Sequence, residues 1–132
     1  MKKLLLLFIT TSFVLSQNLI EDVSEKYKNG AIKTINYYQR VSNKIVEARQ
    51  ENYYENGQIE NEKNYKDGKL DGKWTENYKN GKKKKKYNYK DGKEDGKWTS
   101  YYENGQLRSE GNFKDGKLDG KWNFYNKDGS IR

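Results

Sequence analysis

The residues that could carry out chemistry are restricted in type, because the chain contains neither histidine nor cysteine. Thiol catalysis and disulfides are therefore excluded, and the commonest general base and metal ligand is missing. Carboxylates remain, but Asp67, Asp91 and Asp115 stand at turn positions, where turn geometry explains them. No phosphate-binding motif and no calcium loop is present. We therefore expect a protein that is not an enzyme and that uses no cofactor or metal.

Three tryptophans form the first set of side chains that could bind a macromolecule. Trp74, Trp98 and Trp122 follow one another at a constant interval. On successive hairpins of a sheet they would form a ladder with steps of about 10 Å, which is two strand spacings. Such a ladder could stack on sugar rings or grip a partner. The alternative is that the tryptophans are simply the thin core of the sheet.

An unbroken lysine run forms the second set, Lys82, Lys83, Lys84, Lys85 and Lys86. The run is a candidate contact for a polyanion, such as a wall polymer or an anionic membrane, and such binding would weaken with salt. The alternative is a solvated face that protects against edge pairing. We expect a wetter sheet here, with the stems of Lys83 and Lys85 lying along Tyr78 and Tyr87.

Glycines keep the same interval as the tryptophans and should position both sets. A period between about 20 and 50 residues is typical of stacked repeat arrays, in which each unit covers the hydrophobic face of its neighbour. The repeat-defining glycines before the last turn are Gly57, Gly68, Gly72, Gly81, Gly92, Gly96, Gly105, Gly116 and Gly120.

Each regular unit contains two turn dipeptides, Asn-Gly and Asp-Gly, which favour two-residue type I′ hairpin turns. Such turns would set Tyr54 opposite Ile59 and Tyr65 opposite Leu70. The same rule pairs Tyr27 with Ile32, Tyr102 with Leu107 and Phe113 with Leu118. Because the segments between turns differ by two residues, the ladder must lose register, and we expect a bulge at Gly72, Gly96 and Gly120.

The sequence therefore predicts an all-β fold, an elongated single-layer antiparallel β-meander of tandem 24-residue hairpin repeats, preceded by an N-terminal signal helix. Hydrophobic residues make up 32% of the chain against 35% charged residues, but 12 Tyr, 4 Phe and 3 Trp supply large apolar side chains. One face should carry Leu70, Trp74 and Tyr78. The open edges could also pair between chains, so edge-to-edge self-association is a candidate contact.

The N-terminus predicts export. Lys2 and Lys3 precede an apolar run that is shorter than a membrane-spanning helix needs, and a plausible cleavage site lies before Gln17. We interpret residues 1–16 as a signal peptide, 17–26 as a linker or N-terminal cap, 27–53 as a degenerate first repeat, and 54–132 as regular repeats with a partial last unit. Removal of two lysines from a net charge of +8 leaves +6. The predicted location is secreted, periplasmic or on the cell surface.

The segments KDGKLDGKW, YYENGQ and YKNGK resemble the MORN repeat variant, often grouped with YwqK-type antitoxins. The resemblance covers residues 27–132 and is strongest over 54–125. It implies open rows of β-hairpins that act as a scaffold for protein contact, or for lipid contact in some related eukaryotic proteins. An antitoxin against a cytoplasmic toxin has no evident use for a secretion signal.

We expect a secreted or surface-exposed repeat scaffold that binds another macromolecule, with a protein as the leading partner. One alternative is an antitoxin-like inhibitor that sequesters a cognate toxin. Another is a binder of cell-wall glycan or anionic lipid. Secretion argues against nucleic acid as a partner.

Overall fold

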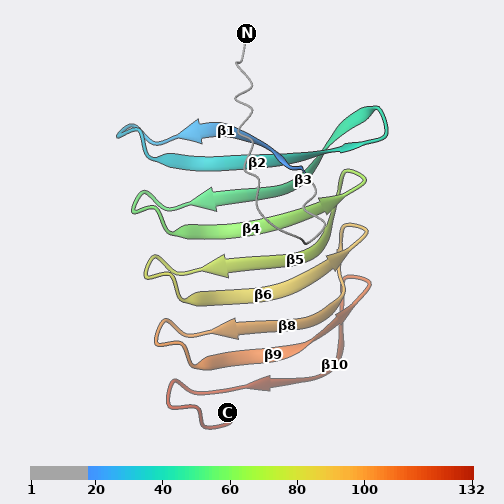
Figure 1. Cartoon of the computed structure of the whole chain (residues 1–132). Helices are drawn as coiled ribbons and strands as arrows, with labels where there is room; N and C mark the ends of the chain where they lie inside the picture. The colour runs from blue at the N-terminus through green and yellow to red at the C-terminus, as the bar shows by residue number, and fades with distance from the viewer. Residues whose placement is uncertain (1–17) are drawn as a thin grey trace.

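The computed structural model describes residues 18–132, which form one open antiparallel sheet of tandem hairpins (Figure 1). The predicted signal peptide and its helix lie outside the described residues. The hairpins follow one another along the sheet, so the molecule is elongated. No helix capable of spanning a membrane occurs within residues 18–132.

The sheet follows chain order, β1-β2-β3-β4-β5-β6-β8-β9-β10, and the two-residue β7 pairs only with β6. Residues 20–26 belong to the segment predicted to be either a linker or an N-terminal cap, and they form the edge strand β1. The strands are β1 (Ile20–Lys26), β2 (Ile32–Val41), β3 (Lys44–Tyr53), β4 (Ile59–Lys66), β5 (Lys69–Asn77), β6 (Lys83–Lys90), β7 (Lys93–Glu94), β8 (Gly96–Tyr101), β9 (Leu107–Lys114) and β10 (Lys117–Phe124).

The Asp-Gly turns at Asp67, Asp91 and Asp115 lie together at one end of the strands, on the right in Figure 1. Asp67 and Gly68 both have positive φ, 50° and 75°, and Lys66 pairs directly with Lys69. This is the two-residue turn that the sequence predicts. The predicted pair Tyr65–Leu70 is confirmed, as is Phe113–Leu118.

The Asn-Gly loops lie at the other end, and here the predicted two-residue turn is wrong. Gly57 N–H donates to the Tyr54 carbonyl and Tyr54 N–H donates to the Gln58 carbonyl, each at 2.9 Å. Three residues therefore bridge the strands, and only Gly57 among them has positive φ. The Asn56 side chain accepts the Gln58 N–H at 3.0 Å, which stabilises this wider loop.

The wider loop moves the cross-strand partners by one residue. Ile59 pairs with Tyr53, not with Tyr54. Leu107 likewise pairs with Tyr101, and Ile32 pairs with Lys26. The predicted partners Tyr54, Tyr102 and Tyr27 are thereby freed from the ladder and lie in the loops.

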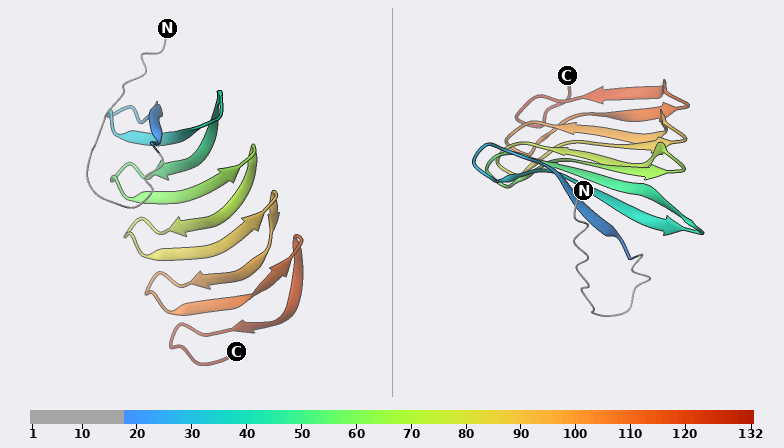
Figure 2. Two further views of the ribbon diagram at one scale, coloured as in Figure 1. Left: turned by 45° about the vertical axis from the view of Figure 1, so that its right-hand side comes forward. Right: turned by 90° about the horizontal axis from the view of Figure 1, so that it is seen from above.

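The longer strand of each regular unit gains two residues near its glycine. Tyr65 pairs with Leu70, whereas Lys63 pairs with Trp74, so β5 contains two more residues than β4 over this stretch. Gly72 lies in this bulge with a φ of 92°. A shift of the same size is present in the other two units, at Gly96 and Gly120. The strands bend beyond it toward the Asp-Gly turns (Figure 2).

A single layer buries little apolar surface. Within residues 18–132, the buried hydrophobic side chains are those of Ile35, Tyr37 and Tyr87. Leu70 and Trp74 lie on one side of the sheet, which we call the ring face, as the sequence predicts. Tyr78 instead lies in an Asn-Gly loop.

Candidate binding surface

One row of side chains crosses the ring face at the middle of the strands. Trp74 pairs with Lys63 on one side and with Tyr87 on the other. The Trp74 and Tyr87 rings are stacked with their centroids 5.4 Å apart, and the Tyr89 ring lies at the same distance from Trp74. The Lys63 ammonium lies 4.9 Å from the Trp74 centroid. The row is thus a packed ring cluster with a cation at its margin.

The next two tryptophans do not keep the ladder spacing of about 10 Å expected from two strand spacings. The centroids of Trp98 and Trp122 are 5.1 Å apart. Gly111 pairs with Trp98 on the strand between them, and a Cβ at that glycine would lie 2.3 Å from the Trp122 ring. The indole therefore occupies the space that a side chain would fill. The edge of Phe113 completes this cluster, 5.3 Å from Trp122.

Gly111 is a site residue that the sequence analysis missed. It stands one repeat after Tyr87 and two repeats after Lys63, at the same repeat position. Unlike the turn and bulge glycines it has no positive φ, so its role is to leave space. The sequence could have indicated this role, because Gly111 stands in the middle of a strand where the other repeats carry a large side chain.

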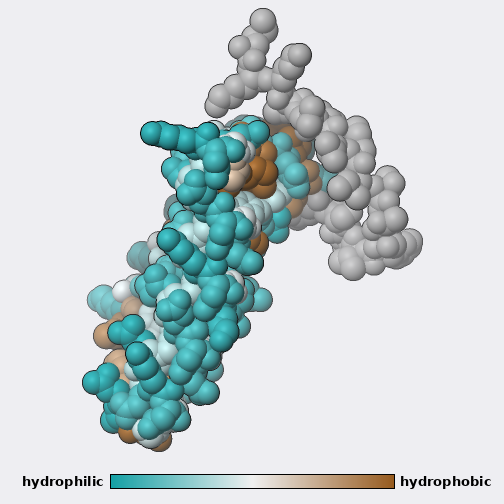
Figure 3. Space-filling view, turned by 90° about the vertical axis from the view of Figure 1, so that its left-hand side faces the viewer, coloured by the Kyte–Doolittle hydropathy of each residue, from teal (hydrophilic) through white to brown (hydrophobic). Residues whose placement is uncertain are grey.

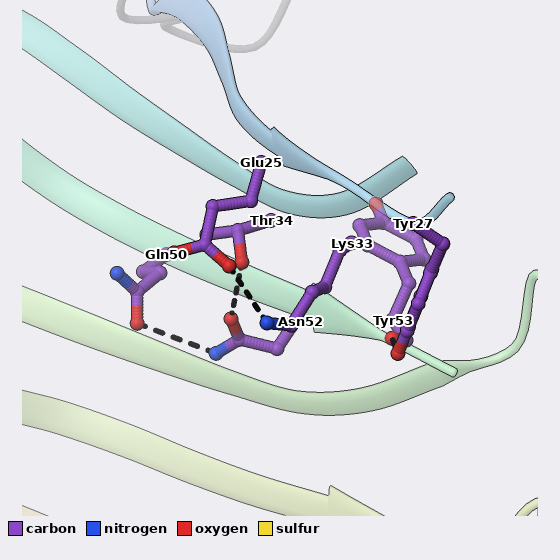
Figure 4. Close-up of polar contacts among 7 residues, drawn as sticks. All are labelled: Glu25, Tyr27, Lys33, Thr34, Gln50, Asn52 and Tyr53. Carbon is purple, nitrogen blue, oxygen red and sulfur yellow. Dashed lines mark hydrogen bonds and ion pairs between the residues drawn. The ribbon is translucent and has the colours of Figure 1, made fainter. Parts of the chain in front are cut away.

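The first half of the ring face carries amides in place of rings (Figure 4). Gln50 stands one repeat before Trp74 and so takes the tryptophan position. The Thr34 hydroxyl donates to the Asn52 side chain at 2.9 Å, and the Asn52 amide donates to Asn61 at 2.8 Å. Asn52 also donates to Gln50 at 3.3 Å. Hydrogen bonds thus connect β2, β3 and β4 across the face where ring contacts connect the later strands.

The tyrosines of the Asn-Gly loops connect each Asn-Gly hairpin to the next. Each loop tyrosine hydroxyl donates to a backbone carbonyl of the following Asn-Gly hairpin, at 2.7 to 2.9 Å. Sequence reasoning missed these loop-tyrosine bonds, although a tyrosine two residues before every Asn-Gly was a visible signal. The bonds are Tyr27 to Tyr53, Tyr54 to Asn77, Tyr78 to Tyr101 and Tyr102 to Tyr125.

The lysine run is divided between different environments. Lys85 lies 3.7 Å from the Glu76 carboxylate, which also accepts the Tyr87 hydroxyl at 2.8 Å. Lys84, and not Lys83 as expected, has its ammonium over the Tyr78 ring, 5.9 Å from the centroid. The bulge opposite Asn77 shifts the register by one residue and causes this exchange.

A buried carboxylate lies beneath the first hairpins, on the side opposite the ring face. Glu51 accepts the hydroxyls of Tyr37 and Tyr53, and Arg49 lies 3.4 Å from the same carboxylate. Burial, followed by the hydrogen bond to Glu51, raises the pKa of both tyrosines. Both phenols therefore stay protonated at neutral pH. They act as hydrogen-bond donors that hold the carboxylate and not as general bases.

Carboxylates beside the Asp-Gly turns hold this end of the sheet together. The Asp71 carboxylate accepts the backbone N–H of Asp91 at 3.2 Å, and Asp95 accepts that of Asp115 at 3.4 Å. Across residues 18–132, no three His, Cys, Asp or Glu side chains are grouped so that they could hold a metal ion. The arrangement suits binding by surface contact.

The fold defines a tandem β-hairpin repeat protein. The family model for the MORN repeat variant matches residues 47–67, 70–91 and 94–115, so the chain contains three tandem copies of this repeat. No curated protein and no solved structure matched the chain. The match concerns the repeat type, and it does not bear on an antitoxin activity.

Proposed function

We propose that this chain is an exported, non-enzymatic repeat scaffold and that it binds another protein through the ring face of its last hairpins. One observation carries this proposal. Leu118 is 67% exposed and Phe124 is 50% exposed on a sheet that is only one layer thick. In the view of Figure 3, apolar side chains are visible at both ends of the array. Exposed apolar groups beside packed rings are typical of protein contact surfaces.

The ring contacts favour a protein over a glycan. A sugar stacks on an open aromatic face, but the rings here pack against one another. Trp122 has Trp98 at 5.1 Å and Phe113 at 5.3 Å. The surface left for a ligand is therefore the side chains of Leu118 and Phe124 together with ring edges, which suit an apolar protein anchor.

Crosslinking in the source cell tests the partner. The whole chain is crosslinked in intact cells, and attached proteins are identified by mass spectrometry. The test variant combines Leu118→Ser with Phe124→Ser. The matched control combines Val41→Ser with Ile45→Ser, which are 49% and 53% exposed at the other end of the array.

We expect one stoichiometric protein with the unchanged chain and with the control, and its loss with the test variant. If the attached protein is a toxin, the antitoxin alternative takes the place of a general scaffold. Absence of any stoichiometric protein, or equal capture by both variants, would refute the proposed surface.

Export has its own test. The N-terminus of the chain recovered from source-cell fractions is sequenced. Export with cleavage predicts a chain that begins at Gln17 and is found outside the cytoplasm. A cytoplasmic chain that retains Met1 and Lys2 would contradict the export part of the proposal without affecting the binding surface.

A further inference from the structure

The second of the regular hairpins carries lysine at six positions where neither neighbour does, and five of these lysines, all except Lys85, take part in no ion pair within residues 18–132. Equivalent positions in the neighbouring hairpins show which other side chains the same backbone carries. The first hairpin has Glu55, Gln58, Ile59, Glu60 and Glu62, with a net charge of −3. The third has Glu103, Gln106, Leu107, Arg108 and Glu110, with a net charge of −1. The second has Lys79, Lys82, Lys83, Lys84 and Lys86, with a net charge of +5.

The fold does not require these lysines. Apart from Arg108, neutral or acidic side chains occupy the same backbone positions in the flanking hairpins, with the same loop hydrogen bonds. At position 83 the lysine also replaces an apolar side chain that its counterparts Ile59 and Leu107 provide. Like charges placed together destabilise a sheet. A cluster that the backbone does not need and that opposes folding indicates a ligand of opposite charge.

The structure gathers the five lysines at the Asn-Gly end of β5 and β6, and we call them the lysine patch. Lys83 pairs with Asn77, and Lys86 lies between Thr75 and Thr99. None of the patch takes part in the ion pairs found in residues 18–132, whereas the neighbouring Lys85 pairs with Glu76. Four of the patch lysines belong to the run predicted from the sequence. The fifth member of that run, Lys85, is excluded because it pairs with Glu76, and Lys79 is added.

Acidic neighbours limit the width of the lysine patch. Glu55, Glu60 and Glu62 lie on the hairpin before it, and Glu103 and Glu110 lie on the hairpin after it. One hairpin is about 10 Å wide, given a strand spacing of about 4.8 Å. A flat anionic membrane would therefore meet carboxylates on both sides. An extended anionic chain that runs along β6 would meet no carboxylate on that strand.

We propose that the lysine patch binds an acidic, extended peptide segment of the protein partner, aligned with β6. This inference rests on the proposed function, because it names the chemistry of the partner's second contact. Carboxylates of the segment would pair with ammonium groups that lack an ion-pair partner in the described chain. The flanking carboxylates would reject segments that lie across the hairpins.

The test measures binding of a fluorescent oligo-glutamate peptide to the whole chain at low and high salt. The patch variant changes Lys79, Lys82, Lys83, Lys84 and Lys86 to Gln. The control variant removes the same charge at the Asp-Gly turns by changing Lys66, Lys69, Lys90, Lys93 and Lys117 to Gln. Circular dichroism verifies that both variants are folded. Oligophosphate and phosphatidylglycerol vesicles are compared as alternative ligands.

We expect the patch variant to bind oligo-glutamate about tenfold more weakly, because several exposed ion pairs are lost together. The control variant should bind within about twofold of the unchanged chain, and salt should weaken binding by the unchanged chain. Equal losses in both variants, or no binding by the unchanged chain, would overturn the proposal. Binding to oligophosphate or vesicles alone would also overturn it.

The crosslinking test separates this inference from the proposed function. If the patch variant still captures the partner while oligo-glutamate fails to bind, only the acidic segment is refuted. If the partner is never captured, the proposed function fails independently of the peptide result.

Discussion

The two halves of the ring face share one backbone and differ in chemistry. In the first half, Gln50 and Asn52 connect the strands by side-chain hydrogen bonds. In the second half, Trp98 and Trp122 connect them by ring contact. The loop-tyrosine bonds occur in both halves at nearly the same length. The repeat therefore maintains the sheet through its loops, and the face is free to change its side chains.

The largest expected difference between the halves comes from removing one side chain from each. Trp98→Ala should lower the free energy of unfolding by about 3 kcal/mol, because it removes a half-buried ring and its contact with Trp122. Gln50→Ala should cost about 1 kcal/mol, the net worth of side-chain hydrogen bonds. Urea unfolding of the two variants measures both values. Equal costs would mean that the halves are energetically alike.

Gly111→Ala should destabilise the second half of the ring face, where Trp98 and Trp122 are in contact. The added methyl group would overlap the Trp122 ring, and overpacking of this kind costs about 2 kcal/mol. Lys63→Ala at the same repeat position is the matched control and should cost less, about 0.5 to 1 kcal/mol, for the loss of its contact with the Trp74 ring. Thermal unfolding of both variants measures the two stability losses. A neutral Gly111→Ala would show that the two indoles do not meet over this residue.

High pH should weaken the sheet at two places, because one tyrosine donates to a carboxylate on the ring face and another does so beneath the first hairpins. Burial and the bond to Glu76 raise the pKa of Tyr87, and burial and the bond to Glu51 raise that of Tyr53. Below about pH 10 both the folded and the unfolded chain keep these protons. Above it the unfolded chain loses them first, so stability falls by about 1.4 kcal/mol per pH unit and per tyrosine.

Unfolding measured from pH 8 to pH 12 tests this dependence. Tyr87→Phe and Tyr53→Phe should each reduce the slope above about pH 10 by a similar amount, because the titrating hydroxyl is removed. A slope that neither substitution changes would show that these hydroxyls are not protected in the folded state.

The smallest expected effect concerns the feature that the halves share. Tyr78→Phe and Tyr27→Phe each remove one loop-tyrosine bond and should each cost about 1 kcal/mol. The two costs should agree, in contrast to the ring and amide substitutions. Urea unfolding of the pair measures them. A cost confined to Tyr78 would show that the first loop is not held to the next unit in this way.

Much of the fold follows from the spacing of the glycines. Asp67-Gly68 predicts its turn correctly because the backbone conformation of the two residues alone decides it. Asn56-Gly57 does not, because the Asn56 side chain bonds to the Gln58 N–H and the Tyr54 hydroxyl reaches the next unit. The Tyr54 bond joins successive hairpins, and a rule that considers only the turn residues cannot predict it.

The candidate surfaces were predictable in part. The lysine run and the tryptophan period are visible in the sequence, but the contact between Trp98 and Trp122 depends on the missing side chain of Gly111. The narrow width of the lysine patch depends on which neighbouring hairpins carry carboxylates. Comparing each position with its equivalents in the adjacent repeats provides that information, once the register is known.

Nuclear Overhauser contacts between side chains test most directly the claim that one backbone carries two different faces. Strong contacts are expected between the indole protons of Trp98 and Trp122. Contacts are also expected between the side-chain amides of Asn52 and Asn61. Indoles with no mutual contact, or Asn52 amide protons that contact only water, would contradict this claim.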